Sequence, residues 1–124
     1  GEHKKMSTKL ALLKSGDNII ADIKELISEE KVCGYLFGKP HVVEYRVPVI
    51  LSEDKDYKQP PTRDLEVALI PWILFTEEDK VPVRSDWIVT IVEPTLAVKE
   101  MYEEKVNVQS NQTDNSDEPT NLSE

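Results

Sequence analysis

Apolar and polar residues alternate along much of the first quarter of the chain. In "NIIADIKELI", residues 18–27, Ile19 and Ile23 fall on one side of an extended chain and Asp22 on the other. This period of two predicts a strand with one face toward water. The run "KLALL" comes before it, and in the intervening "KSGD" Gly16 can adopt a positive φ. The pattern therefore predicts a β-hairpin near the start of the chain.

The longest apolar stretch is "VCGYLFGKPHVVEYRVPVIL", residues 32–51. Its length and its content of β-branched and aromatic residues predict a long strand. We expect a bend or break at "GKP", because Gly38 permits a bulge and Pro40 cannot donate to a strand ladder. Cys33 alternates with apolar neighbours and is expected to be buried. Since it is the single cysteine, no disulfide can form within the chain.

Two further aliphatic runs, "LEVALIPWILF" and "VPVRSDWIVTIVEP", are predicted as the last two strands, joined through the charged "TEED". Pro71 marks the point where the first of them loses a donor and bends away. We expect Trp72 near a rim and Trp87 in the barrel or in a seam between subunits, toward opposite ends of this arm. The arm is interpreted as a pairing device rather than a binding site.

The pattern changes to a helical one after Glu93. In "TLAVKEMYEEKV", Val98, Met101 and Tyr102 recur at helical spacing, which predicts a short amphipathic helix. The last sixteen residues contain four acids and no base, a composition typical of a disordered tail. The expected division is a flexible N-terminus at 1–8, a β-barrel at 9–93, the helix at 94–108 and a disordered acidic tail at 109–124.

A chain of 124 residues, 39% of them hydrophobic, has room for one domain and one modest core. About five β segments in a meander are too few for a sandwich with two well-filled faces. We therefore predict a mainly all-β fold: a small, strongly bent, open barrel of five strands with a short C-terminal helix.

The composition also bears on partners and chemistry. A net charge of −9 disfavours a broad electrostatic contact with phosphates. No apolar run reaches the roughly 20 residues that span a bilayer. The only histidines are His3, in the terminus expected to be mobile, and His41, beside Pro40 at a strand start or in a loop, so no nucleophile–base pair is expected. With the single cysteine they are too few ligands for a zinc site. Adjacent acids lie in turns without the spacing of a calcium loop. We predict no enzyme, cofactor, metal, membrane partner or small-molecule substrate.

"LALLKSGDNIIADIKEL" resembles the first segment of Sm-like proteins, and the two last strands resemble the second, whose paired strands contact the neighbouring subunit. More narrowly, "SGDNIIADI", "PW" and "IVTIVEPTLAVKEMY" resemble small Sm-like proteins encoded by marine T4-type bacteriophages. The resemblance implies an Sm-like barrel, a homo-oligomeric ring, and a location in the bacterial cytoplasm or in the virion.

The chain departs from the Sm pattern where RNA would bind. The corresponding loops are "SEEK" and "FTEEDKVPV", which carry consecutive acids in place of the expected Asp and Asn and the basic pair. No nucleotide-binding residue is therefore carried over from the family.

Two functions follow as expectations. The first is a non-enzymatic, ring-forming module, because strands that are apolar on both sides need cover that a monomer cannot provide. Its predicted subunit interface consists of Leu65, Val67, Leu69, Ile88, Val89 and Ile91. The alternative is an RNA-binding regulator or RNA chaperone, in which aromatic side chains beside cations would contact the bases. The residues predicted for that contact are Tyr35, Lys39, Tyr45 and Arg46.

Overall fold

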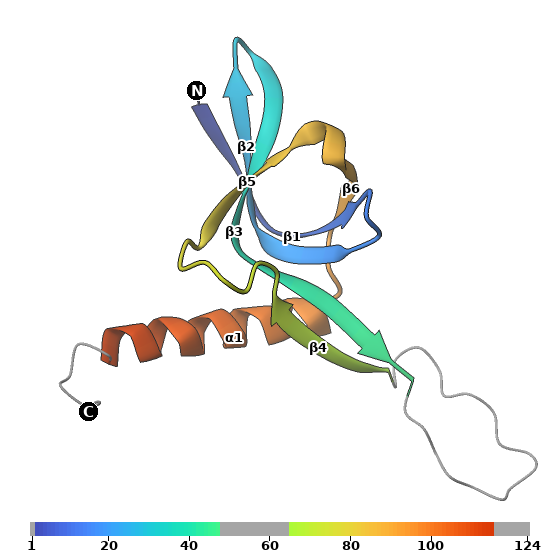
Figure 1. The fold of residues 1–124 in the computed structure, drawn as a ribbon, viewed down its shortest axis with the longest axis vertical. Helices are drawn as coiled ribbons and strands as arrows, with labels where there is room; N and C mark the ends of the chain where they lie inside the picture. The colour runs from blue at the N-terminus through green and yellow to red at the C-terminus, as the bar shows by residue number, and fades with distance from the viewer. Residues whose placement is uncertain (1, 48–64, 116–124) are drawn as a thin grey trace, which may run out of the picture.

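The computed structural model describes residues 2–47 and 65–115, and it shows a mainly β protein with one α-helix (Figure 1). The strands are β1 Glu2–Leu13, β2 Asn18–Ser28, β3 Lys31–Arg46, β4 Glu66–Pro71, β5 Lys80–Arg84 and β6 Ile88–Val92. A short 3-10 helix, η2 Ser85–Trp87, lies between β5 and β6, and α1 Leu96–Asn115 follows.

All pairings are antiparallel, and the sheet has the order β4-β3-β2-β1-β6, with β5 also paired to β3. The first three strands form a meander, and the last strand returns to the first. Within the described residues, β6 pairs with neither β4 nor β5, so the sheet curves without closing. The predicted open, mainly β architecture and the C-terminal helix are confirmed.

The structure has six strands where the sequence pattern predicts five. The segment "VPVRSDWIVTIV" is expected to be one strand, but η2 divides it into β5, which pairs with β3, and β6, which pairs with β1. A single turn of 3-10 helix at Ser85–Trp87 redirects the chain from one side of the sheet to the other.

The bend predicted at "GKP" is confirmed as a bulge in β3. Ile20 pairs with His41 and Asp22 with Gly38, so two residues of β3 lie opposite the single residue Ala21. Lys39 takes a left-handed φ of 49° at this point. The outer partner of β3 also changes here, because β5 pairs with Gly34–Gly38 and β4 with His41–Arg46.

The core lies on both faces of β2. One cluster gathers around Phe37 inside the curve of the sheet, and a second joins Ile20, Leu69 and Tyr102 beneath α1. The members of the first cluster are Ala11, Leu13, Ile19, Ala21, Ile23, Phe37 and Val83. The expectation of a wet face on β2 is therefore wrong at Ile20, which is fully buried because the helix covers it.

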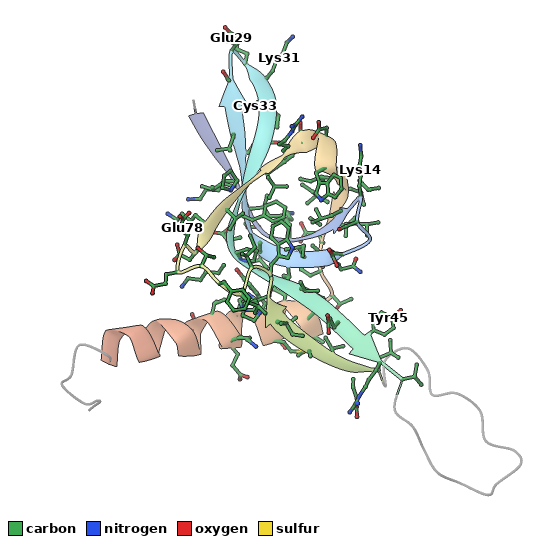
Figure 2. The ribbon with its side chains drawn as sticks, viewed as in Figure 1. Lys14, Glu29, Lys31, Cys33, Tyr45 and Glu78 are labelled. Carbon is green, nitrogen blue, oxygen red and sulfur yellow. The ribbon has the colours of Figure 1, made fainter. Side chains whose placement is uncertain are left out.

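Three other expectations differ from the structure. Strand β1 starts at Glu2, within the range 1–8 predicted to be flexible, because Glu2 pairs with Ile27. Helix α1 continues to Asn115, into the predicted tail 109–124, of which residues 116–124 lie outside the described residues. Cys33 is exposed rather than buried, because the β2–β3 hairpin projects beyond the core (Figure 2); its Sγ donates to the Leu26 carbonyl at 3.2 Å.

Candidate functional site

The bulge in β3 leaves two carbonyl groups that side chains then satisfy. The Tyr102 hydroxyl donates to the Gly38 carbonyl at 2.8 Å, and His41 Nδ1 donates to the Lys39 carbonyl at 2.9 Å. The two rings meet edge to face, with centroids 5.8 Å apart. This contact attaches α1 to the point where the sheet bends.

His41 is almost completely buried, with 3% of its surface exposed. Because Nδ1 carries the hydrogen, Nε2 is unprotonated, and it has no hydrogen-bond partner among the described residues. Burial lowers the pKa of His41 below its usual 6.5. The hydrogen bond to the Lys39 carbonyl raises this pKa in part, and the positive charge of Lys105 lowers it further. Burial likewise raises the pKa of Tyr102 to about 12.

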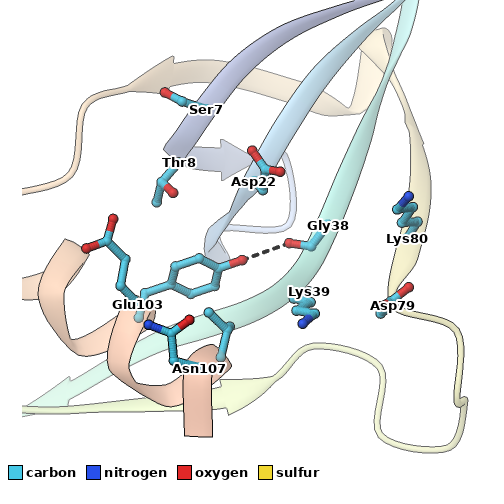
Figure 3. Close-up of a pocket in the computed structure, with 11 residues that line it drawn as sticks. Ser7, Thr8, Asp22, Gly38, Lys39, Asp79, Lys80, Glu103 and Asn107 are labelled. Carbon is cyan, nitrogen blue, oxygen red and sulfur yellow. Dashed lines mark hydrogen bonds between the residues drawn. The ribbon is translucent and has the colours of Figure 1, made fainter. Parts of the chain in front are cut away.

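A cavity of about 500 Å³ lies beside this contact, between α1, the bulge and the start of β5 (Figure 3). Charged side chains line it from several elements: Asp22 from β2, Asp79 and Lys80 near β5, and Glu103 from the helix. The hydroxyls of Ser7 and Thr8 also reach it, but His41 is not among its lining residues. The lining residues therefore offer no histidine that could activate a hydroxyl as a nucleophile.

The edge of the sheet at β4 is partly occupied by the helix. Trp72 N–H donates to the Pro40 carbonyl. Because the direction of backbone groups alternates along a strand, the N–H and C=O of Ile70 point toward β3 and those of Leu69 point away from it. The outward carbonyl of Leu69 accepts a hydrogen bond from Lys105 Nζ at 2.5 Å. In Figure 1 the first part of α1 lies next to β4.

The edge at β5 is interrupted by a proline. Lys39 N–H donates to the Asp79 carbonyl. By the same alternation, the backbone groups of Val81 point toward β3, and the backbone of Pro82 lies on the outer edge. Proline has no N–H, so a strand added at this edge would lack a donor at its centre. The sequence "KVPVR" contains this proline, but its outward direction depends on the pairing of β5 with β3.

In the described residues, the edge at β6 has neither a side-chain hydrogen bond from the helix nor a proline. Lys14 N–H donates to the Trp87 carbonyl. By the same alternation, the backbone groups of Leu12 and Leu10 also point toward β6, where they lie opposite Thr90 and Val92. Ile91, between these two, therefore directs its N–H and C=O away from β1. The strand "IVTIV" contains no charge and no proline. It is the candidate functional site, because its free backbone groups are a template for another strand.

The two tryptophans, expected toward opposite ends of the hairpin arm, line one cavity of about 580 Å³ together with Lys14, Arg84 and Asp86. Trp72 packs on Phe37, with ring centroids 6.2 Å apart, and Trp87 is 45% exposed. The separation of β5 from β6 by η2 explains the difference, because it places Trp87 at the turn.

The residues predicted for a subunit interface fall into two groups. Leu69 is buried inside the subunit, and Val67, Ile88 and Ile91 pack against the two core clusters, so their side chains mainly serve the fold of one chain. Leu65, half-buried, precedes β4, whereas Val89 is 58% exposed on β6. Three of the predicted residues, Ile88, Val89 and Ile91, lie on β6, the strand whose outer backbone edge is described above.

The residues predicted for nucleic-acid contact do not form one patch. Tyr35 packs against the core, and Lys39 lines the cavity beneath α1. Tyr45 and Arg46 lie at the far end of β3 (Figure 2), where Arg46 Nε is 2.5 Å from Glu66 Oε1. Along a strand of sixteen residues these side chains are too widely spread to contact one base.

Two searches bear on other classes of site. Among the described residues, no group of three or more His, Cys, Asp or Glu side chains is arranged to hold a metal ion. None of the helical residues that the structure describes forms a helix long and apolar enough to cross a membrane.

Among the residues that the structure describes, these features define a small, open, antiparallel β-protein with one helix packed against its bend and with an unpaired strand edge at β6. The chain belongs to a family of unknown function (DUF6561), whose model matches residues 6–107. No curated protein matches the chain.

The Tyr102 hydroxyl can be tested by Tyr102→Phe. This change leaves the half-buried Gly38 carbonyl without this donor, so we expect the free energy of unfolding to fall by about 1–2 kcal/mol, measured with urea. Tyr45→Phe removes the same atom from a side chain that is 65% exposed, and a change below about 0.5 kcal/mol is expected. Equal effects of the two changes would contradict the role assigned to Tyr102.

The buried His41 predicts a pH dependence. Its pKa is lower in the folded chain than its usual 6.5, so the contribution of the neutral ring is present above that pH and is lost as the pH falls below it. His41→Asn retains a donor toward the Lys39 carbonyl but does not titrate. Between about pH 7.5 and about pH 5.5 the wild-type chain should lose more stability than this variant in urea unfolding. Parallel losses would show that another group is responsible.

Proposed function

We propose that this protein is a non-enzymatic interaction module of the Sm-like kind that assembles with copies of itself through the free edge of β6. One observation carries the proposal: Ile91 presents both of its backbone hydrogen-bonding groups at the end of the sheet, in a strand without charge or proline. Such an edge is prone to pair with another strand, and folded proteins usually block it.

The contrast with the other edges supports this reading. Lys105 occupies an outward carbonyl of β4, and Pro82 interrupts β5. The acids that flank β6 are also neutralised within the chain, because Glu93 pairs with Lys9 and Asp86 with Arg84. A second strand approaching β6 would therefore meet no unpaired carboxylate among these flanking residues.

The strand order is compatible with the Sm-like resemblance. A meander bends at β3, and the last strand returns to pair with the first, which leaves an edge at each end of the sheet. A ring would form if β6 met a different edge of the next copy, and a dimer would form if β6 met itself.

RNA binding is the second candidate, and the cavity between the tryptophans favours it. Trp72 and Trp87 offer aromatic surface on which bases can stack, and Lys14 and Arg84 lie at the same opening. Aromatic rings beside cations are the usual means of binding single strands. The pairing of Arg84 with Asp86 at 2.7 Å leaves Lys14 as the principal positive charge.

Self-association is tested by placing a charge on the open edge. Thr90 is exposed, so Thr90→Lys should leave the fold intact while a lysine opposes strand addition. Light scattering after gel filtration at micromolar concentration should give at least twice the 14.2 kDa chain mass for the wild type. The variant should dissociate at least about tenfold more readily. Ser28→Lys, at the exposed end of β2, is the matched control and should behave as the wild type. A monomeric wild type would reject the proposal.

RNA binding is tested by tryptophan fluorescence during titration with a short single-stranded RNA at low salt. If the cavity binds RNA, Lys14→Glu should weaken binding by about tenfold. Lys31→Glu makes the same change of charge at the tip of the β2–β3 hairpin, away from the cavity (Figure 2), and should alter affinity by less than about twofold. Equal losses from both variants, or unsaturable binding, would eliminate this candidate.

A further inference from the structure

The free edge of β6 has one residue around which a second copy can be centred. Thr90 and Val92 use their backbone groups toward β1, and Ile88 N–H is bonded to the Ser85 carbonyl. Val89 is the extra residue at the register shift opposite Leu12 and Leu13. Among the regularly paired residues of β6, this leaves Ile91 as the residue whose N–H and C=O both point away from the sheet.

A single outward residue of this kind is self-complementary. Two copies of Ile91 placed opposite each other in antiparallel strands can exchange two hydrogen bonds, N–H to C=O in each direction. The arrangement is related by a two-fold axis, so the same groups are satisfied on both copies. The side chain of Ile91 already packs against the core, so its rotamer need not change.

The edges at β4 and β5 are poor partners for β6. A head-to-tail contact with β5 would meet Pro82 where a donor is required, and a contact with β4 would have to displace Lys105 from the Leu69 carbonyl. A second β6 presents neither obstacle. Among the edges at β4, β5 and β6, edge chemistry therefore favours an isologous contact of β6 with itself over a repeating contact.

We propose that two copies of this chain pair β6 with β6, antiparallel, across a two-fold axis at Ile91, joining their sheets edge to edge. This inference rests on the proposed self-association and specifies its geometry. It replaces the ring expected from the Sm-like resemblance with a closed dimer.

The register is defined by the axis. Thr90 lies opposite the partner subunit's Val92, in a pair without mutual backbone hydrogen bonds, where Cα atoms approach to about 4.5 Å. Both side chains are exposed on the outer face of the single chain, Val92 by 47%. Glu93 lies opposite the partner subunit's Val89 and remains paired with Lys9, so no two carboxylates face each other.

Disulfide trapping tests this register. In a Cys33→Ser background, which removes the single exposed thiol, the variants Thr90→Cys and Val92→Cys are prepared separately. They are then mixed, allowed to exchange subunits and oxidised mildly. The predicted separation of Cα atoms suits a disulfide between residue 90 of one copy and residue 92 of the other. The mixture should give a covalent dimer from up to about half of the chains, and each variant alone only a trace.

The outcomes separate this inference from the proposed function. A cross-linked mixture together with a dimeric mass supports both. A monomer by light scattering overturns both. An oligomer that the mixture cannot cross-link leaves self-association standing and overturns the two-fold contact at β6. Cross-linking of the Thr90→Cys variant alone, as efficient as in the mixture, overturns the axis at Ile91.

Discussion

A strand of sixteen residues can curve and change partners only if its ladder is interrupted, and β3 is interrupted at Gly38–Pro40. The bulge turns the strand, so that β5 pairs before it and β4 after it. It also leaves the carbonyls of Gly38 and Lys39 to be satisfied by Tyr102 and His41. Helix α1, the second core cluster and the cavity lined by Asp22 and Glu103 all lie next to this one irregularity.

The helix has a second consequence for the edges of the sheet. Because Tyr102 holds α1 at the bulge, Lys105, three residues further on, reaches the outward carbonyl of Leu69. The same packing that completes the core thus also occupies part of an edge that would otherwise be open. On the opposite side, β6 pairs with β1 alone among the described strands, and no hydrogen bond from α1 to its outer edge is found within this part of the chain.

Local patterns predict much of this architecture. Gly38 and Pro40 indicate the bend, alternation indicates the first hairpin, and the spacing of Val98 and Tyr102 indicates the helix. The turn Ser85–Trp87 is less visible, because a short polar interruption inside an apolar run does not show which neighbour each half will pair with. Cys33 follows the alternation of a buried strand, yet it is exposed because the hairpin extends past the core. The candidate site is predicted at the level of the strand alone, since Ile91 is singled out by hydrogen-bond direction rather than by side-chain type.

By itself, the sequence determined that the protein is mainly β, where its longest strand bends, and that a helix follows the last strand. These features depend on residues close together in the chain: a glycine, a proline and the period of apolar positions. Only the tertiary structure decided which sheet edges are open, that Trp72 and Trp87 line one cavity, and that His41 and Tyr102 meet. Those outcomes depend on pairing between distant segments, where shifting a strand by one residue reverses the direction of every backbone group.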